Sequence, residues 1–199
     1  MNHLAHLLLA GPDASLRAGG FLGDFVRGTL HGERPAAIEQ GIALHRYIDA
    51  RTDRHPAVRA VVGEFRSPWR RWAPVALDVW FDHLLARRFG EFADQPLESF
   101  AAAAHADLDR YKRHYPVPAL RFLDRMQRHA LLCAYRDRDN IRGVLARLAK
   151  RSPRAAPLMN IDGELIRLET RVEASFEVLL PDLQRAADAW RAGNGQTVD

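Results

Sequence analysis

Two predicted helices carry acidic and imidazole side chains on the stripe that should face the protein interior. The first stripe comprises Ile38, Ile42, His45, Asp49 and Thr52, at spacings of four, three, four and three residues. This spacing places all five on one helical face, and the isoleucines indicate that the face is buried. A buried carboxylate without a partner costs several kcal/mol, so Asp49 requires a cation or strong hydrogen-bond donors.

The second stripe carries two carboxylates. It comprises Val75, Asp78, Asp82, Leu85 and Phe89, at spacings of three, four, three and four residues. Carboxylates one helical turn apart repel each other, and they repel more strongly when buried. A divalent cation between Asp78 and Asp82 would turn this repulsion into attraction.

Further candidates precede these stripes and bring the set to four predicted helices. The complete set of imidazole and carboxylate candidates is His6, Asp24, His45, Asp49, Asp78, Asp82 and His83. Mixed ligands of this kind suit Mn²⁺, Fe²⁺ or Zn²⁺, and Mg²⁺ where carboxylates dominate. Spacing alone leaves a structural alternative open, in which the same carboxylates pair with some of the 27 Arg residues.

The elements that must position these residues are helices. Apolar residues recur with a helical period between the Pro and Gly residues, and no strand-like alternation fits better. The predicted helices are 2–9, 15–30, 35–54, 57–65, 75–92, 97–114, 118–135, 140–150 and 163–190, the last interrupted at Pro181. We therefore predict an all-α fold, a compact single-domain multi-helix bundle over residues 1–191, with a frayed tail at 192–199.

Composition excludes several classes of protein. The 199 residues are 47% hydrophobic and 27% charged, which is typical of a globular chain rather than a disordered one. The net charge is +4 with a pI near 9.7, which suits an anionic partner. Acidic and basic residues are interspersed, however, and no basic block carries the interleaved aromatics of nucleic-acid binders.

Other motifs are missing from the sequence. No apolar run is long enough for membrane insertion, and residues 1–10 do not resemble a signal peptide. The single Cys133 fits a reducing cytoplasm, and we interpret it as a packed core thiol. A single cysteine excludes thiolate zinc clusters, and neither a phosphate-binding Gly-rich loop nor a nucleophile elbow is present.

Several segments, taken in order, resemble the acyl carrier protein phosphodiesterase family. They are Met1-Asn2-His3-Leu4-Ala5-His6-Leu7, Gly23-Asp24-Phe25-Val26-Arg27-Gly28, Gly41-Ile42-Ala43-Leu44-His45-Arg46-Tyr47-Ile48-Asp49 with Thr52-Asp53, Leu77-Asp78-Val79-Trp80-Phe81-Asp82-His83, Tyr135-Arg136-Asp137 and Leu168-Glu169-Thr170-Arg171. The chain departs from the family pattern at His3, where an apolar or aromatic residue is expected, and at Leu8, where a further His is common.

The resemblance implies a Mn²⁺-dependent enzyme, distantly related to the all-helical HD-type phosphohydrolases. It would cleave 4′-phosphopantetheine from the serine of holo-acyl carrier protein. In this interpretation the metal ligands come from the candidate set His6, Asp24, His45, Asp49, Asp78 and Asp82. Arg27 and Arg46 would neutralise the phosphoryl oxygens or, as an equal alternative, pair with Asp24 or Asp49 to hold the helices. His83 or a neighbouring His would protonate the leaving serine oxygen.

The resemblance also implies a docking face for the carrier protein. The candidates are Arg70 and Arg71, before the Asp78 helix, and Arg87 and Arg88 farther along it. Two alternatives stay open at this point. One is an HD-like phosphohydrolase that acts on a nucleotide or another small phosphodiester, and the other is a non-catalytic helical binding module.

Overall fold

The computed structural model describes residues 1–193, and within them every regular element is a helix. The α-helices are α1 (His3–Leu9), α2 (Ala14–Leu22), α3 (Ala36–Arg54), α4 (Pro56–Glu64), α5 (Ala73–Arg87), α6 (Leu97–Arg110), α7 (Val117–Arg128), α8 (Leu131–Ala134), α9 (Arg138–Ala149), α10 (Asp162–Arg167) and α11 (Glu169–Ala192). Short 3₁₀ turns lie at Trp69–Trp72, Phe89–Glu91, Lys112–His114 and Pro153–Asn160. The predicted all-α class is confirmed.

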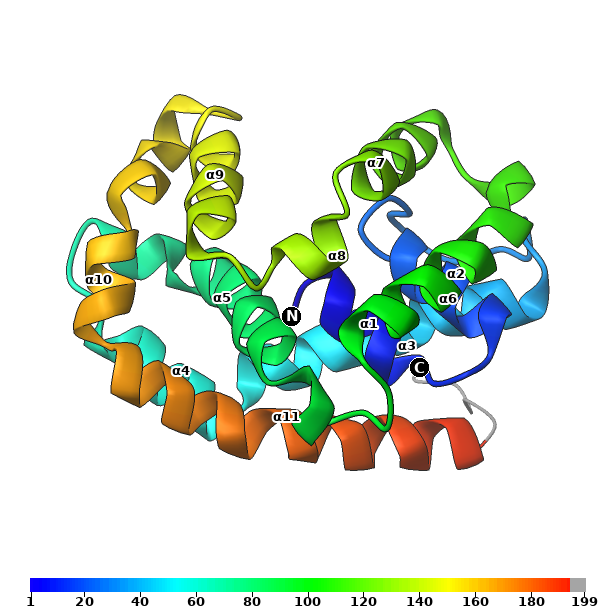
Figure 1. The fold of residues 1–199 in the computed structure, drawn as a ribbon, viewed down its shortest axis with the longest axis horizontal. Coiled ribbons are helices and arrows are strands. Elements are labelled where there is room, and N and C mark those ends of the chain that lie inside the picture. The colour runs from blue at the N-terminus through cyan, green and yellow to red at the C-terminus, as the bar shows by residue number, and fades with distance from the viewer. Residues whose placement is uncertain (194–199) are drawn as a thin grey trace.

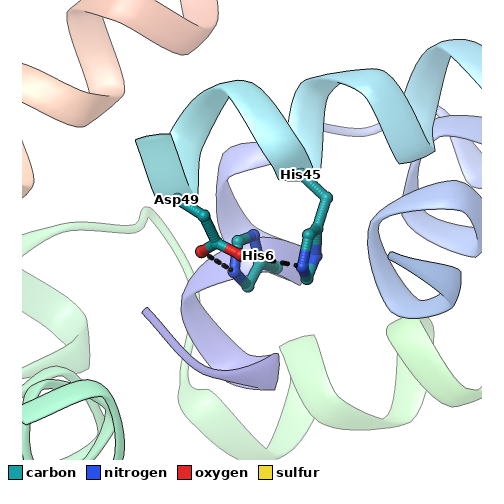
Figure 2. A group of neighbouring side chains, drawn as sticks. All are labelled: His6, His45 and Asp49. Atoms are coloured by element: carbon teal, nitrogen blue, oxygen red, sulfur yellow. Dashed lines mark ion pairs between the residues drawn. The ribbon is translucent and has the colours of Figure 1, made fainter. Parts of the chain in front are cut away.

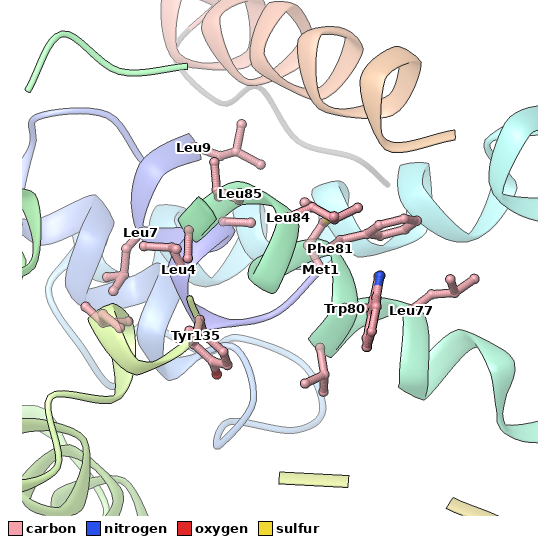
Figure 3. Packing of buried hydrophobic residues seen from close by; sticks show 14 of the residues in the cluster. Met1, Leu4, Leu7, Leu9, Leu77, Trp80, Phe81, Leu84, Leu85 and Tyr135 are labelled. Carbon is pink, nitrogen blue, oxygen red and sulfur yellow. The ribbon is translucent and has the colours of Figure 1, made fainter. Parts of the chain in front are cut away.

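Helix α1 lies at the centre of the molecule. Six of its seven residues are buried, including both of its histidines. Figure 1 shows α11 running along the base of the fold, while α7 and α9 rise on opposite sides of α8 and the N-terminus. Leu4, Leu7 and Leu9 pack with Leu84, Leu85 and other residues of α5, as Figure 3 shows. A helix enclosed on all sides can hold polar groups only where a partner is supplied.

Helices α2 and α3 approach each other unusually closely. A Cβ added to Gly19 would lie 2.5 Å from the Cα of Gly41, so only glycine fits at this crossing. The close crossing brings the carbonyl groups at the end of α2 within reach of side chains on α3. The two glycines therefore determine how near α3 lies to α1 and α2.

Helix boundaries differ from the predicted ones in several places. Helix α2 is capped by Asp13 and ends at Leu22, although a helix over 15–30 is predicted. Residues 23–35 form an irregular connection, in which Gly28 and Gly32 have positive φ. Helical periodicity continues past Gly23, which itself keeps helical dihedrals, but the positive φ of Gly28 excludes an unbroken helix as far as residue 30.

Two longer predictions are divided at other residues. The predicted 118–135 helix breaks at Ala130, whose φ of 44° separates α7 from α8. The predicted 163–190 helix breaks at Leu168 instead of at Pro181, and α11 runs through Pro181 without interruption. Pro181 cannot donate to the carbonyl of Glu177, but Glu177 is exposed, so water can hydrogen-bond that group.

The remaining structural expectations concern burial. Trp80 and Phe81 are buried, and Trp69 and Trp72 pack against the core, as predicted for core or wall residues. Cys133 is only half-buried, so it lies at the edge of the core. Within residues 1–193, no helix combines the length and apolarity needed to cross a membrane. Most of the predicted tail, residues 194–199, lies outside the described residues.

Candidate functional site

Three of the predicted ligand residues meet in one cluster, formed by His6 of α1 and by His45 and Asp49 of α3. The Nε2 atom of His6 lies 3.0 Å from Oδ1 of Asp49, and Nε2 of His45 lies 3.1 Å from Oδ2. The two imidazole rings stack, with their centroids 3.7 Å apart. Figure 2 shows both rings directed toward the one carboxylate. The residues His6, His45 and Asp49 are called the ligand cluster below.

The end of α2 holds the ring of His45 in place. Nδ1 of His45 lies 2.8 Å from the carbonyl oxygen of Gly20, to which it donates when that nitrogen carries the proton. Nε2 is then left with a free lone pair directed at the cluster. Gly23 provides the space for the ring, because a Cβ at Gly23 would lie 2.1 Å from Cγ of His45.

Electrostatics within the ligand cluster favours an ionised Asp49 and a neutral His6. Burial lowers the pKa of His6 to about 4, with a contribution from the charge of His45. Burial opposes ionisation of Asp49, but the close contacts with the imidazoles of His45 and His6 hold the pKa of Asp49 well below its usual range. Burial also opposes protonation of His45, yet Asp49 raises the pKa of His45 overall.

The donor set fits a divalent cation. Nδ1 and Nε2 of His6 are both buried and make no hydrogen bond of acceptable geometry. Within residues 1–193, His6, His45 and Asp49 form the one group of at least three ligand atoms that lie within 4.8 Å of one another. Two imidazoles and one carboxylate are ligands that suit Mn²⁺, Fe²⁺ or Zn²⁺ better than Mg²⁺.

Asp24 lies beside the ligand cluster, on the loop that follows α2. Its Oδ1 is 3.9 Å from Nε2 of His45, and its Oδ2 is 3.5 Å from Nδ1 of His3. His3 is buried, and its ring centroid lies 4.5 Å from that of Phe122. Asp24 is therefore placed next to the ligand cluster but outside the 4.8 Å group.

The two carboxylates of α5 do not join the ligand cluster. Oδ1 of Asp78 lies 2.7 Å from the Met1 nitrogen, which in turn lies 3.7 Å from Oδ1 of Asp49. Asp82 is fully buried and accepts hydrogen bonds from the amides of Asn2, Leu4 and Ala5, at 3.3, 2.7 and 3.2 Å. Asp82 thus caps the first turn of α1, and it is not placed to share a cation with Asp24 and Asp78.

His83 and Arg46 hold neighbouring backbone in place. Nδ1 of His83 lies 2.7 Å from the carbonyl oxygen of Tyr135, and His83 is buried against Trp80. Arg46 donates to the carbonyl oxygen of Val26 at 3.0 Å, across the loop that carries Asp24 and Arg27. Neither His83 nor Arg46 lines the cleft that opens beside the ligand cluster.

A cleft of about 580 Å³ opens beside the ligand cluster. Met1, His3, Asp24 and Asp78 line its inner end, which connects it to the cluster through the contacts above. The rest of its lining is Asn2, Phe25, Arg27, Val75, Val79, Phe122, Arg125, Leu131, Tyr135, Val144, Arg147, Leu148 and Arg151.

The predicted docking arginines lie elsewhere. Arg88 is bound by Glu91 and Glu177, and Arg70 donates to the carbonyl oxygen of Phe65. Arg71 and Arg87 are exposed, and none of the four lines the cleft.

Sequence reasoning missed several residues that shape the site. Gly20 accepts a contact from His45, and Gly23, directly after α2, leaves space for its ring. The concentration of glycines at 19, 20 and 23 was the signal in the sequence. Arg125, Arg147 and Arg151 line the cleft, but they gave no signal in a chain with 27 Arg residues.

The sequence is similar to that of known proteins over nearly its whole length. A sequence profile described as acyl carrier protein phosphodiesterase matches residues 1–183. A relative of that name from Salmonella dublin is 39% identical over 192 residues, which cover 94% of this chain and 100% of the relative. One from Salmonella typhimurium is 38% identical with the same coverage. No solved structure matches the chain significantly, so the predicted likeness to HD-type phosphohydrolases stays a prediction.

Proposed function

The chain belongs to the acyl carrier protein phosphodiesterase family, and from this membership we propose that it hydrolyses the phosphodiester between 4′-phosphopantetheine and the carrier serine. Water adds its oxygen to phosphorus, the bond from phosphorus to the serine oxygen breaks, and that oxygen takes up a proton. The products are apo-carrier protein and free 4′-phosphopantetheine. We propose the cytoplasm as the compartment, in keeping with the single unpaired thiol of Cys133.

The observation that carries the catalytic part of this proposal is the ligand cluster, which lies beside the cleft next to the lining residues Asp24 and Met1. His6, His45 and Asp49 would hold a divalent cation, with Mn²⁺ preferred and Fe²⁺ or Mg²⁺ as alternatives. A bound cation would supply positive charge against a phosphate oxygen and lower the pKa of a water molecule. The mixed imidazole and carboxylate donors support this assignment, as do the two buried nitrogens of His6, which make no hydrogen bond.

The other residues at the inner end would bind and orient the substrate. The guanidinium of Arg27 would neutralise charge on the phosphoryl group, since Arg27 lines the cleft beside Asp24. Gly20 would keep the metal-binding nitrogen of His45 directed at Asp49. Arg46 would act indirectly, because its hydrogen bond to Val26 holds the loop that carries Asp24 and Arg27.

Mass spectrometry of holo-acyl carrier protein provides the direct test. After incubation with the purified protein and Mn²⁺, the carrier should lose the mass of phosphopantetheine, and EDTA should prevent the loss. A carrier of unchanged mass in the presence of Mn²⁺ would contradict the proposed activity. Screening of nucleotides and small phosphodiesters in the same buffer would then address the alternative phosphohydrolase.

A further inference from the structure

Tyr135, the residue that follows α8, is both buried and part of the cleft wall. Its ring packs with the hydrophobic core, among the residues that Figure 3 shows. Its hydroxyl group accepts a hydrogen bond from Nδ2 of Asn2 at 3.1 Å, and Asn2 also lines the cleft. Asn2 follows Met1, which lines the inner end of the cleft, so the hydroxyl of Tyr135 lies near that end.

The hydroxyl proton of Tyr135 has no acceptor among residues 1–193. The hydroxyl oxygen accepts its hydrogen bond from Asn2, and its own O–H remains free to donate. Burial raises the pKa of Tyr135 well above its usual value, and the negative charges of Asp82 and Asp24 raise it further. The hydroxyl therefore keeps its proton at neutral pH. A protonated donor without an acceptor, at the wall of a cleft, is suited to an oxygen atom of a bound ligand.

Contacts with α5 fix the position of Tyr135. The carbonyl oxygen of Tyr135 lies 2.7 Å from Nδ1 of His83, which donates to it when that nitrogen carries the proton. The backbone amide of Asn2 lies 3.3 Å from Oδ1 of Asp82, so the partner of the hydroxyl is also held by α5. His83 and Asp82 are both buried. The hydroxyl is thus held in place before any substrate binds, as an effective transition-state donor must be.

We propose that the hydroxyl of Tyr135 donates a hydrogen bond to a nonbridging oxygen of the substrate phosphodiester, and that His83 positions Tyr135 for this contact. This inference rests on the proposed function, which brings a phosphodiester to the inner end of the cleft. A donor is needed there, because the carboxylates of Asp24 and Asp78 line the same end and would repel an anionic oxygen. A preorganised donor stabilises charge on the phosphoryl oxygens in the transition state.

This assignment changes the role of His83. From the sequence, we expect His83 or a neighbouring His to protonate the leaving serine oxygen. In the structure, His83 contacts the backbone of Tyr135 and does not line the cleft. His83 is accordingly a positioning residue, and Tyr135 is the residue that contacts the substrate.

Removal of the hydroxyl alone provides the first test. Tyr135→Phe keeps the ring in the core and removes the donor. The matched control is Tyr115→Phe, at a buried tyrosine outside the cleft whose hydroxyl has no hydrogen-bond partner within residues 1–193. The readouts are kcat and KM for holo-carrier protein with Mn²⁺ across a range of pH, the affinity for Mn²⁺ by isothermal titration, and thermal melting.

Tyr135→Phe should lower kcat by about a hundredfold, the usual effect of losing one preorganised donor. The factor should be the same at every pH, since the hydroxyl donates without releasing its proton. Mn²⁺ affinity should match the wild type, because Tyr135 makes no hydrogen bond to the ligand cluster. Tyr115→Phe should keep the kcat of the wild type.

Three results would overturn the inference. The first is wild-type kcat in Tyr135→Phe, or an equal loss in Tyr115→Phe. The second is a rise in KM without a change in kcat, because the hydroxyl would then contribute nothing specific to the transition state. The third is a parallel loss of kcat and Mn²⁺ affinity, which would place the effect at the ligand cluster.

Substitution of His83 provides the second test. His83→Asn keeps an N–H donor near the position of Nδ1, whereas His83→Leu removes it. His83→Asn should retain most of kcat and His83→Leu should lose it, and His83→Leu should add little to the loss in Tyr135→Phe. If His83→Asn loses as much kcat as His83→Leu and the losses at the two residues multiply, His83 acts independently of Tyr135 and the inference is wrong. Failure of the proposed function appears differently, as an unchanged mass of holo-carrier protein with the wild-type protein.

Discussion

Helices α3 and α5 carry nearly the same pattern, and the fold uses the two patterns differently. Each has an ionisable pair one turn apart on an apolar stripe, His45 with Asp49 and Asp78 with Asp82. On α3 the pair meets the imidazole of His6 and forms the ligand cluster. On α5 the buried Asp82 meets three backbone amides at the start of α1.

The difference lies in what each stripe faces. Helix α1 presents a side chain to α3 and its N-terminal amides to α5. Unpaired N–H groups at a helix N-terminus also attract a carboxylate, and the positive end of the helix dipole adds to this attraction. A buried carboxylate on an apolar stripe therefore indicates that a partner exists, but the partner can be a backbone terminus as well as a cation.

The largest effect is expected from the α3 carboxylate. Asp49→Ala should lower kcat for holo-carrier protein by roughly a thousandfold, about 4 kcal/mol of transition-state stabilisation, because it removes the anionic member of the ligand cluster. The fold should persist, since the Asp49 side chain is 42% exposed. Asp94→Ala, at an exposed position outside the cleft, provides the control for kinetics and thermal melting. Wild-type turnover by the Asp49→Ala variant would remove the ligand cluster from the mechanism.

The buried carboxylate of α5, Asp82, should affect the stability of the fold more than metal binding. Asp82→Ala leaves three amides of α1 without an acceptor in a buried position, and we expect the free energy of unfolding to fall by about 3 kcal/mol. Asp82→Asn keeps one acceptor oxygen and should lose less. Urea denaturation of the metal-free proteins measures both. If instead Asp82→Ala is as stable as the wild type and has lost Mn²⁺ binding, Asp82 acts as a ligand and the contrast with α3 disappears.

The space that Gly23 leaves for the His45 ring should have a smaller effect, on the affinity for Mn²⁺. Gly23→Ala adds a Cβ that would meet Cγ of His45 at 2.1 Å, so the ring must move. Displacing an oriented ligand typically weakens metal affinity by roughly tenfold to a hundredfold. Isothermal titration with Mn²⁺ checks this, and Gly63→Ala, where nothing lies within 4 Å, is the matched substitution. Equal Mn²⁺ affinity in the two variants would show that the ring position is not limiting.

The sequence predicts the helical class and the inward-facing stripe of α3, because both follow from helical periodicity. His45 and Asp49 appear on a buried stripe whatever lies opposite them. The role of Asp82 could not be predicted, since it depends on where the N-terminus of α1 lies in space. The position of Arg125, Arg147 and Arg151 in the cleft could not be predicted either, since it also depends on the tertiary structure.

Opposite responses to acid provide the smallest and sharpest test of the comparison between α3 and α5. Burial raises the pKa of Asp82 to about 7, although its amide donors favour the ionised form. The folded state therefore binds a proton below pH 7 that the unfolded state binds only near pH 4. Relative to Asp82→Asn, the wild type should gain stability as the pH falls from 7 toward 4, and lose that contribution as the pH rises through 7.

The ligand cluster should respond in the other direction. Burial lowers the pKa of His6 to about 4, so between pH 6.5 and 4 the unfolded state binds a proton that the folded state excludes. Relative to His6→Gln, the wild type should lose stability over that window, and each slope is at most about 1.4 kcal/mol per pH unit. Urea denaturation of the wild type, Asp82→Asn and His6→Gln in EDTA, from pH 4.5 to 7.5, resolves the two slopes. A buried carboxylate and a buried imidazole that are both held neutral change the unfolding free energy in opposite directions as the pH falls. If the two differences from the wild type have slopes of the same sign, the proposed contrast between α3 and α5 is wrong.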